Sequence, residues 1–219
     1  MVQQVSLEIM EFIEHNILPR YTAFGKSHGL QHVNRVIKNS IELANYTGAD
    51  INMVYVIAAY HDLGMSGPRA IHHLTGGKIL SNDSRLKRWF NTDQLKIMKE
   101  AVEDHRASSS HTPRTIYGKI VAEADRDLEL DVVFSRAIQY GFSRAIQFGL
   151  ENYPELDKEG QWKRFESHMN EKYSRNGYIH LWIPGSPNAK KLKNIQETID
   201  NKTILRAKFE ALYAKEKKE

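Results

Sequence analysis

The stretch VIAAYHDLG, residues 56–64, joins an apolar helix to an adjacent histidine and aspartate. The helix predicted over residues 51–63 is apolar almost all round, which is typical of a helix at the centre of a core, and Gly64 ends it. Adjacent helical residues point in different directions, yet at a helix end both His61 and Asp62 can reach a point that lies between them. This stretch therefore predicts both the centre of the fold and one part of a polar site.

Helical periodicity extends over nearly the whole chain. Apolar residues recur at helix spacings in two N-terminal stripes, from Val5 to Ile17 and from Val33 to Ala44. The pattern predicts an all-α protein, with a helical core over residues 1–150 and a helical extension over residues 151–219 packed on that core. No segment requires a sheet. Further helices are expected over residues 72–80, 92–105, 113–127, 130–150, 158–173 and 188–215.

An eight-residue tandem repeat lies within the helix expected over residues 130–150. FSRAIQYG at residues 134–141 is followed directly by FSRAIQFG at residues 142–149. Eight residues are not a whole number of helical turns, so the two copies present different faces. We interpret the repeat as a local duplication within one long helix.

Composition limits the chemistry that the protein can perform. The chain has 219 residues, 41% of them apolar, with 10 histidines and no cysteine, so disulfides, thiolate metal sites and cysteine nucleophiles are excluded. Much of the net charge of +4 comes from lysines and arginines after residue 189, a pattern typical of a solvated helix face. This argues against nucleic acid as the main partner. Mild basicity remains compatible with a small anionic ligand such as a nucleotide.

No segment has the pattern of a membrane span or of a secretory signal. The longest uninterrupted apolar stretch runs from Val54 to Tyr60, whereas a span needs about 20 residues. Residues 1–18 carry Glu8, Glu11 and Glu14 and lack a basic start followed by an apolar block. We therefore expect no membrane partner and a cytoplasmic location.

Four metal-capable side chains lie on or beside apolar helix faces. His32 borders the second N-terminal stripe, His61 and Asp62 end the most apolar helix, and Asp125 follows an apolar run at residues 120–122. Burying two carboxylates is costly unless a cation compensates their charge. Two imidazoles and two carboxylates therefore predict a site for a divalent cation, and these ligand types suit Mn, Fe, Co, Ni, Zn or Mg.

The histidines and aspartates recur in five segments, in this order: HGLQHVNRV (28–36), AAYHDLG (58–64), HHLTGGKIL (72–80), VEDHRAS (102–108) and GKIVAEADRD (118–127). The segments resemble those of the HD-domain superfamily of metal-dependent phosphohydrolases, which is named for its His–Asp pair. The resemblance covers roughly residues 25–150 and is nearest to small stand-alone bacterial HD proteins, some of which act on nucleotides. It implies an HD-domain helical bundle with additional C-terminal helices.

The resemblance also implies metal ligands, residue by residue. In some branches of the superfamily two further histidines hold a second metal or face the phosphate, and His72 and His105 match them. His73 remains an alternative to His72. The four ligands of the primary metal are matched by His32, His61, Asp62 and Asp125.

Other residues in or beside the same segments are candidates for catalysis and substrate binding. Asp127 is a candidate to orient the attacking water, and Asp62 and His105 are the other catalytic candidates. Cationic side chains, and arginine forks above all, bind phosphate oxygens well. The candidates for substrate binding are Lys26, His28, Arg69, Arg106 and Arg136.

The activity that the resemblance implies is hydrolysis of a phosphoester or phosphoanhydride by a metal-activated water. The expected substrate is a nucleotide or a related small phosphorylated compound. No GYP motif follows the second histidine pair, which argues against the branch that hydrolyses cyclic dinucleotides. Two alternatives stay open: a non-catalytic domain that binds a nucleotide or other ligand, and a di-iron oxygenase whose site His72 and His105 would complete. A homodimer is compatible with each of these functions.

Overall fold

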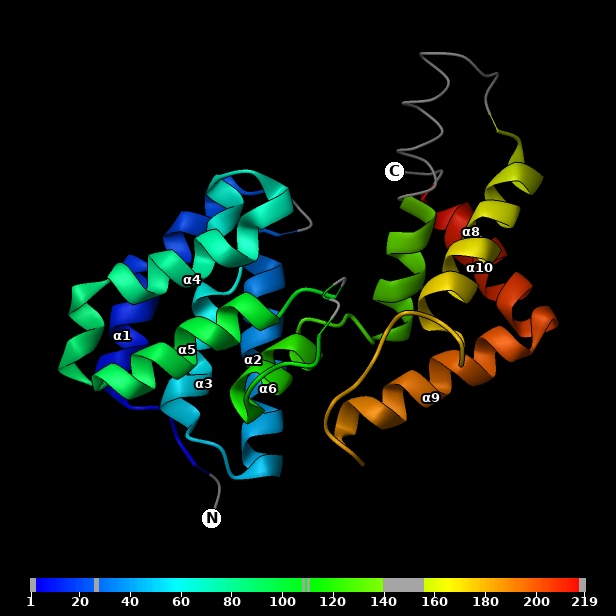
Figure 1. The fold of residues 1–219 in the computed structure, drawn as a ribbon. Coiled ribbons are helices and arrows are strands. Elements are labelled where there is room, and N and C mark those ends of the chain that lie inside the picture. The colour runs from blue at the N-terminus through cyan, green and yellow to red at the C-terminus, as the bar shows by residue number, and fades with distance from the viewer. Residues whose placement is uncertain (1–2, 26–27, 108, 110, 140–155, 217–219) are drawn as a thin grey trace. The chain divides into compact units, whose positions relative to one another are not determined.

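The regular structure of the described residues is entirely helical. The structure, a computed structural model, describes residues 3–25, 28–107, 109, 111–139 and 156–216, and no strand occurs among them (Figure 1). The prediction of an all-α protein is thus confirmed. The chain divides into two compact units, Met1–Arg126 with Leu181–Ser186, and Asp127–His180 with Pro187–Glu219. Among the described residues, none of the helices combines the length and the apolarity needed to cross a membrane.

Helix α3 (Ile51–Tyr60) lies in the middle of the first unit and is buried along nearly its whole length (Figure 1). Asp50 caps its start by accepting hydrogen bonds from the backbone N–H groups of Asn52 and Met53. Short 3₁₀ turns connect the helices, namely η1 (Leu18–Ala23), η2 (Leu63–Ser66), η3 (Arg69–Ile71) and η4 (Ser84–Arg88). The helices that contact α3 are α1 (Leu7–Asn16), α2 (Leu30–Thr47), α4 (His72–Asn82), α5 (Thr92–Asp104) and α6 (Ile116–Ala124).

Helices α3, α5 and α6 are shorter than the sequence pattern predicts, at ends that bear candidate site residues. Helix α5 ends at Asp104 rather than at residue 105. Helix α3 ends at Tyr60 rather than at residue 63. Helix α6 ends at Ala124 and begins only after Thr115, whose side chain accepts a hydrogen bond from the backbone N–H of Gly118. The candidate ligands therefore stand at the points where the chain leaves α3 and α6.

A short return segment, residues 181–186, belongs to the first unit. It is held by Glu123, a fully buried residue of α6 whose carboxylate accepts hydrogen bonds from the backbone N–H groups of Trp182 and Ile183 and from the Ser186 hydroxyl. Burial raises the pKa of Glu123, although these donors oppose the shift. Ile183 joins the apolar core of the first unit. The last turn of α6, next to a candidate ligand, is thereby fixed to a segment far away in the sequence.

The second unit packs around aromatic side chains. It contains residues 130–139, which are helical, together with α8 (Lys158–Tyr173), α9 (Pro187–Asp200) and α10 (Lys202–Glu216). The Phe165 ring lies 5.8 Å from that of Phe134 and 5.3 Å from that of Phe209, and the Trp162 and Phe209 rings are 5.3 Å apart, centroid to centroid. Trp162, Phe165 and Phe209 thus serve packing.

The C-terminal part of the second unit departs from the prediction of one helix over residues 188–215. The Asn201 side chain accepts a hydrogen bond from the backbone N–H of Ile204, and so starts α10 as a new helix after α9. The predicted boundary between residues 150 and 151, and the second copy of the repeat at residues 142–149, lie outside the described residues. That boundary and the packing of the extension on the core remain predictions.

Candidate metal centre

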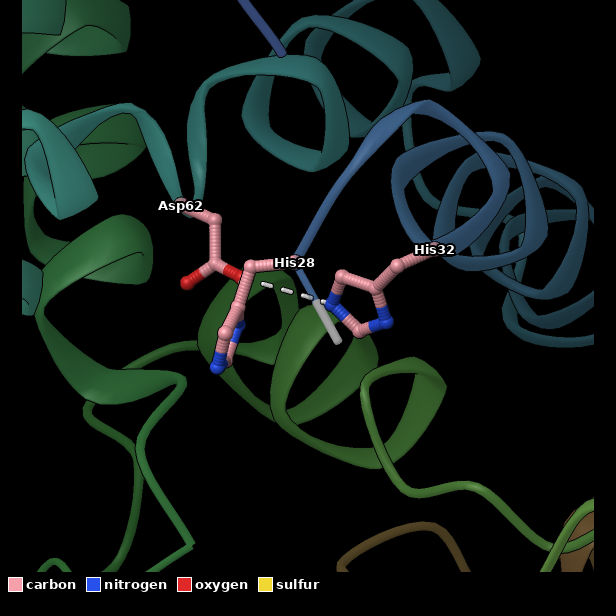
Figure 2. Close-up of side chains that lie close together, drawn as sticks. All are labelled: His28, His32 and Asp62. Atoms are coloured by element: carbon pink, nitrogen blue, oxygen red, sulfur yellow. Dashed lines mark hydrogen bonds and ion pairs between the residues drawn. The ribbon is translucent and has the colours of Figure 1, made fainter. Parts of the chain in front are cut away.

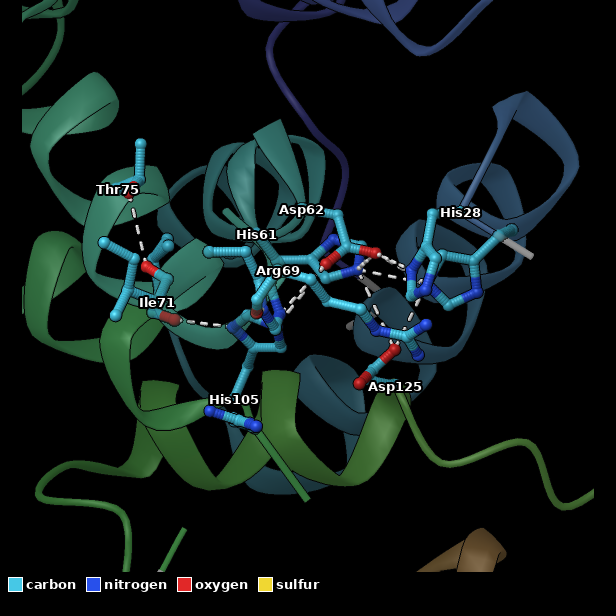
Figure 3. A network of polar contacts seen from close by, with 12 residues as sticks. His28, His61, Asp62, Arg69, Ile71, Thr75, His105 and Asp125 are labelled. Atoms are coloured by element: carbon cyan, nitrogen blue, oxygen red, sulfur yellow. Dashed lines mark hydrogen bonds and ion pairs between the residues drawn. The ribbon is translucent and has the colours of Figure 1, made fainter. Parts of the chain in front are cut away.

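The four residues predicted to hold a primary metal come together in the first unit (Figure 3). His32 Nε2 lies 3.2 Å from Asp125 Oδ1 and 3.2 Å from His61 Nε2. Asp62 Oδ2 lies 3.3 Å from His61 Nε2 and 3.4 Å from His32 Nε2. His32, His61 and Asp125, from α2 and the ends of α3 and α6, thus form one group that could hold a metal. Asp62 Oδ2 contacts the same two rings and forms a second such group with His28 and His32.

A second set of donors shares the carboxylate of Asp62. Its other oxygen, Oδ1, lies 3.5 Å from His72 Nε2 and 3.6 Å from His105 Nε2. The two histidine nitrogens are themselves 3.1 Å apart. Asp62 therefore presents one oxygen to each set of histidine nitrogens.

Helix ends bring these side chains together. His61, His105 and Asp125 are the residues that follow α3, α5 and α6, and His72 begins α4. The C-terminal end of a helix carries a partial negative charge from its free carbonyl groups. Three such ends at one cluster favour a cation there, in addition to the charge of the two carboxylates.

Hydrogen bonds to the backbone fix which nitrogen of each ring faces the cluster. The Nδ1 atoms of His61, His72 and His105 donate to the carbonyl oxygens of Ala58, Arg69 and Val102, at 2.8, 2.8 and 2.6 Å. A carbonyl oxygen only accepts, so each Nδ1 carries the hydrogen and each neutral ring turns the lone pair of Nε2 toward Asp62. Lone pairs and carboxylate oxygens so close together require protons or a cation between them. The donor set therefore fits a divalent metal ion.

Because the cluster is buried, the negative charge of its carboxylates must be compensated by nearby positive charge. His61, Asp62 and His105 are almost fully buried. Burial raises the pKa of Asp62, but the charge of His61 and hydrogen bonds from the surrounding histidines outweigh it and hold the pKa far below its usual value. Burial and the nearby His105 lower the pKa of His72 to about 4. Burial lowers the pKa values of His32 and His105, but hydrogen bonds to the carboxylates prevail and raise both. In the metal-free protein, protons on these two histidines supply positive charge that a metal would otherwise bring.

His32 provides a pH test of this balance. Burial lowers its pKa, but hydrogen bonds to Asp125 and Asp62 prevail and raise it to about 9. A histidine whose pKa rises on folding adds stability that is complete below pH 6.5 and is lost as the pH passes 9. With EDTA, we expect a loss of about 2 kcal/mol between pH 6.5 and 9, or about 5 °C in Tm. Added Mn²⁺ should reverse the trend, because metal replaces the proton and binds more tightly as the pH rises. Equal Tm values at both pH values in EDTA would contradict this balance.

The geometry places His72, rather than the adjacent His73, at the cluster. His72 Nε2 faces both Asp62 and His105, whereas His73 is absent from the groups of the described residues that could hold a metal. His72 begins the helix with its ring toward the cluster, and the next residue necessarily points elsewhere. Burial lowers the pKa of His73.

Among the predicted substrate-binding residues, His28 lies against the cluster (Figure 2). Its Nδ1 donates to Asp62 Oδ2 over 2.7 Å, its ring is 5.7 Å from that of His32, and 24% of its side chain is exposed. Arg69 is exposed, and Figure 3 draws its side chain in front of the cluster residues. Arg106 donates to the Ala70 carbonyl oxygen at 2.6 Å and so ties the chain after His105 to η3. Lys26 lies outside the described residues.

The other two candidates, Asp127 and Arg136, belong to the second unit. Arg136 Nη1 lies 2.5 Å from Asp127 Oδ2, so these two residues pair with each other. Their predicted roles toward the water and the substrate remain predictions.

The sequence pattern did not predict a network of hydrogen bonds around Asp104, next to His105. The fully buried carboxylate of Asp104 accepts hydrogen bonds from the backbone N–H and the guanidinium of Arg114 and from His111 Nε2. It thereby clamps both ends of the chain that leaves His105 toward α6. An acidic residue directly before a predicted ligand was the available signal, but its arginine partner is ten positions away and shares no periodicity with it.

The comparison with protein-family models agrees with this geometry. The family model of the HD domain matches residues 29–128, a range that contains both donor sets. The chain therefore contains an HD domain over residues 29–128. Among solved structures, a predicted HD superfamily hydrolase from an uncultured Thermotogales bacterium is similar, with 22% identity and a TM-score of 0.47, covering 73% of this chain and 82% of that chain. No curated protein gives a significant match.

Proposed function

We propose that this protein is a metal-dependent phosphohydrolase that acts on a phosphoester or phosphoanhydride of a nucleotide or a related small phosphorylated compound. The observation that carries the proposal is the carboxylate of Asp62, which presents one oxygen to His32 and His61 and the other to His72 and His105. The HD domain and the solved relative, itself described as a predicted hydrolase, agree with hydrolysis. A cytoplasmic location is part of the same proposal.

Different residues of the chain would bind the metal, hold its ligands in place and bind the phosphate. One metal would be held by the four primary ligands and a second by Asp62, His72 and His105. When bound, such a divalent ion lowers the pKa of a coordinated water toward neutrality and polarises the phosphoryl oxygen. His28 keeps Asp62 in place by donating to Oδ2. Arg69 supplies positive charge for the phosphate oxygens on the exposed side.

Charge outside the cluster favours a small substrate over nucleic acid. Basic residues of α9 and α10 lie in ion pairs: Lys191 with Glu129 at 2.6 Å and Lys208 with Asp131 at 2.8 Å, for example. Paired lysines are less available to neutralise a row of backbone phosphates.

The test is elemental analysis of the purified protein, followed by a screen of nucleotides and phosphoesters with added Mn²⁺ or Co²⁺. Orthophosphate and pyrophosphate are measured separately, because pyrophosphate as a product means cleavage at the α-phosphorus. Turnover that stops with EDTA and returns with metal is expected. Nucleotide binding without turnover would instead indicate a ligand-binding domain, and visible absorption of an iron pair without hydrolysis would indicate an oxygenase.

Arg69→Ala is expected to raise KM for the phosphate substrate about 10-fold and to leave the metal content unchanged, since a charge-assisted hydrogen bond to phosphate contributes about 1.5 kcal/mol or more. Arg88→Ala is the matched control, because the Arg88 guanidinium lies over the Trp89 ring at 4.9 Å, in η4. Steady-state kinetics checks the prediction. An unaltered KM in Arg69→Ala would show that this arginine is a solvated surface charge.

A further inference from the structure

Tyr21, in η1, is a fully buried residue that lies before the matched HD domain and yet hydrogen-bonds to Asp62 of its His–Asp pair. We propose that Tyr21 is a positioning residue, whose hydroxyl holds the turn at His61 and Asp62 in the conformation that binds metal. The inference rests on the metal centre of the proposed function and adds a residue to it.

The Tyr21 hydroxyl makes two hydrogen bonds at the end of α3. It donates to the carbonyl oxygen of Ala59 over 2.9 Å and accepts from the backbone N–H of Asp62 over 3.3 Å. The Asp62 backbone, at φ −103° and ψ 5°, has already left helical geometry. A single hydroxyl thus joins the last turn of α3 to Asp62, the first residue whose backbone leaves helical geometry.

Both ligands of the pair are therefore fixed to the same turn. His61 is oriented by its own bond to the Ala58 carbonyl oxygen, at 2.8 Å. Asp62 is held through its backbone by Tyr21. Because the two oxygens of Asp62 face different donor sets, a small rotation of its backbone would move both oxygens out of place at once.

The packing around Tyr21 holds its ring, and therefore its hydroxyl, in one position. The ring has no exposed surface and packs edge-on against Phe24, with centroids 5.3 Å apart. A buried phenol hydroxyl needs hydrogen-bond partners, and the two that it has here both belong to the end of α3. Phenylalanine would keep the ring packing and remove only these two bonds.

Tyr21→Phe and Tyr60→Phe form a matched pair for the test. Tyr60, the last residue of α3, is equally buried, but its hydroxyl donates to Asp83 Oδ2 at 2.7 Å and does not contact the cluster. Metal-free protein is titrated with Mn²⁺ by calorimetry and with Co²⁺ by visible absorption. We expect Tyr21→Phe to raise the apparent Kd for Mn²⁺ about 10- to 100-fold and to change the Co²⁺ spectrum. Tyr60→Phe should match the wild type in both, although each variant lowers Tm by several degrees.

Two results would overturn the inference. One is a Kd for Mn²⁺ and a Co²⁺ spectrum in Tyr21→Phe that equal those of the wild type. The other is that Tyr60→Phe weakens Mn²⁺ binding as much as Tyr21→Phe does, which would mean that a general destabilisation of α3 is the cause. Both are distinct from a failure of the proposed function, in which the wild-type protein itself does not bind Mn²⁺ or Co²⁺. Wild-type metal binding without hydrolysis would refute the proposed reaction while leaving the role of Tyr21 supported by the titrations.

Discussion

Asp62→Ala is expected to remove the bound metal and to lower hydrolysis by about 10³-fold or more. Within the described part of the chain, only Asp62 has a carboxylate that faces both donor sets. Its loss therefore leaves each set of histidine nitrogens without the anionic partner that they share. A catalytic metal supplies several kcal/mol of transition-state stabilisation, and each 1.4 kcal/mol is about tenfold in rate. Elemental analysis and single-turnover rates with added Mn²⁺ measure the two effects.

Two further variants make this result specific. Asp62→Asn keeps the shape of the side chain but has one oxygen and no charge, so it should also lose metal. Asp83→Asn removes a carboxylate that accepts from Tyr60 and Arg85, away from the cluster, and should keep full metal content. Unchanged metal content in Asp62→Ala would refute the centre as described.

Local pattern predicted the helices that carry the site, because each bears an apolar stripe and a recognisable end. The apolar run of α3 and Gly64 shortly after it are both visible within a few residues of sequence. The same pattern predicted that His32, His61, Asp62 and Asp125 would face one point, since a buried carboxylate needs compensation wherever it lies.

What the pattern could not predict depends on contacts between distant segments. Tyr21 reaches Asp62 across 41 positions, and Glu123 holds Ile183 across 60. Neither pair lies at a helical spacing, and neither Tyr21 nor Glu123 differs in its own sequence surroundings from an ordinary core or surface residue. The division of the C-terminal helix at Asn201 was also missed, because asparagine inside a helix and asparagine as a cap look alike until the chain direction is known.

Gly64→Ala is expected to have the second large effect, by forcing α4 away from η2. A Cβ at residue 64 would lie 1.9 Å from the carbonyl oxygen of His72 and 2.6 Å from the backbone nitrogen of Gly76. Backbone atoms cannot yield as the end of a side chain can, so the start of α4 must move and take His72 with it. We expect a loss of about 3 kcal/mol in unfolding free energy, a fall in Tm of about 6 °C or more, and one fewer Mn²⁺ bound per chain.

Alanine substitutions at two other glycines distinguish the clash at residue 64 from a general effect of replacing glycine by alanine. A Cβ at Gly67 would lie 3.6 Å from the nearest atom, an ordinary contact, so Gly67→Ala should change stability by less than about 0.5 kcal/mol and keep its metal. At Gly76 it would lie 3.0 Å from the His61 carbonyl oxygen, which predicts an intermediate loss and keeps the test informative if Gly64→Ala does not fold. If Gly64→Ala folded and bound metal like Gly67→Ala, the close approach of α4 to η2 would not be what holds His72 against Asp62.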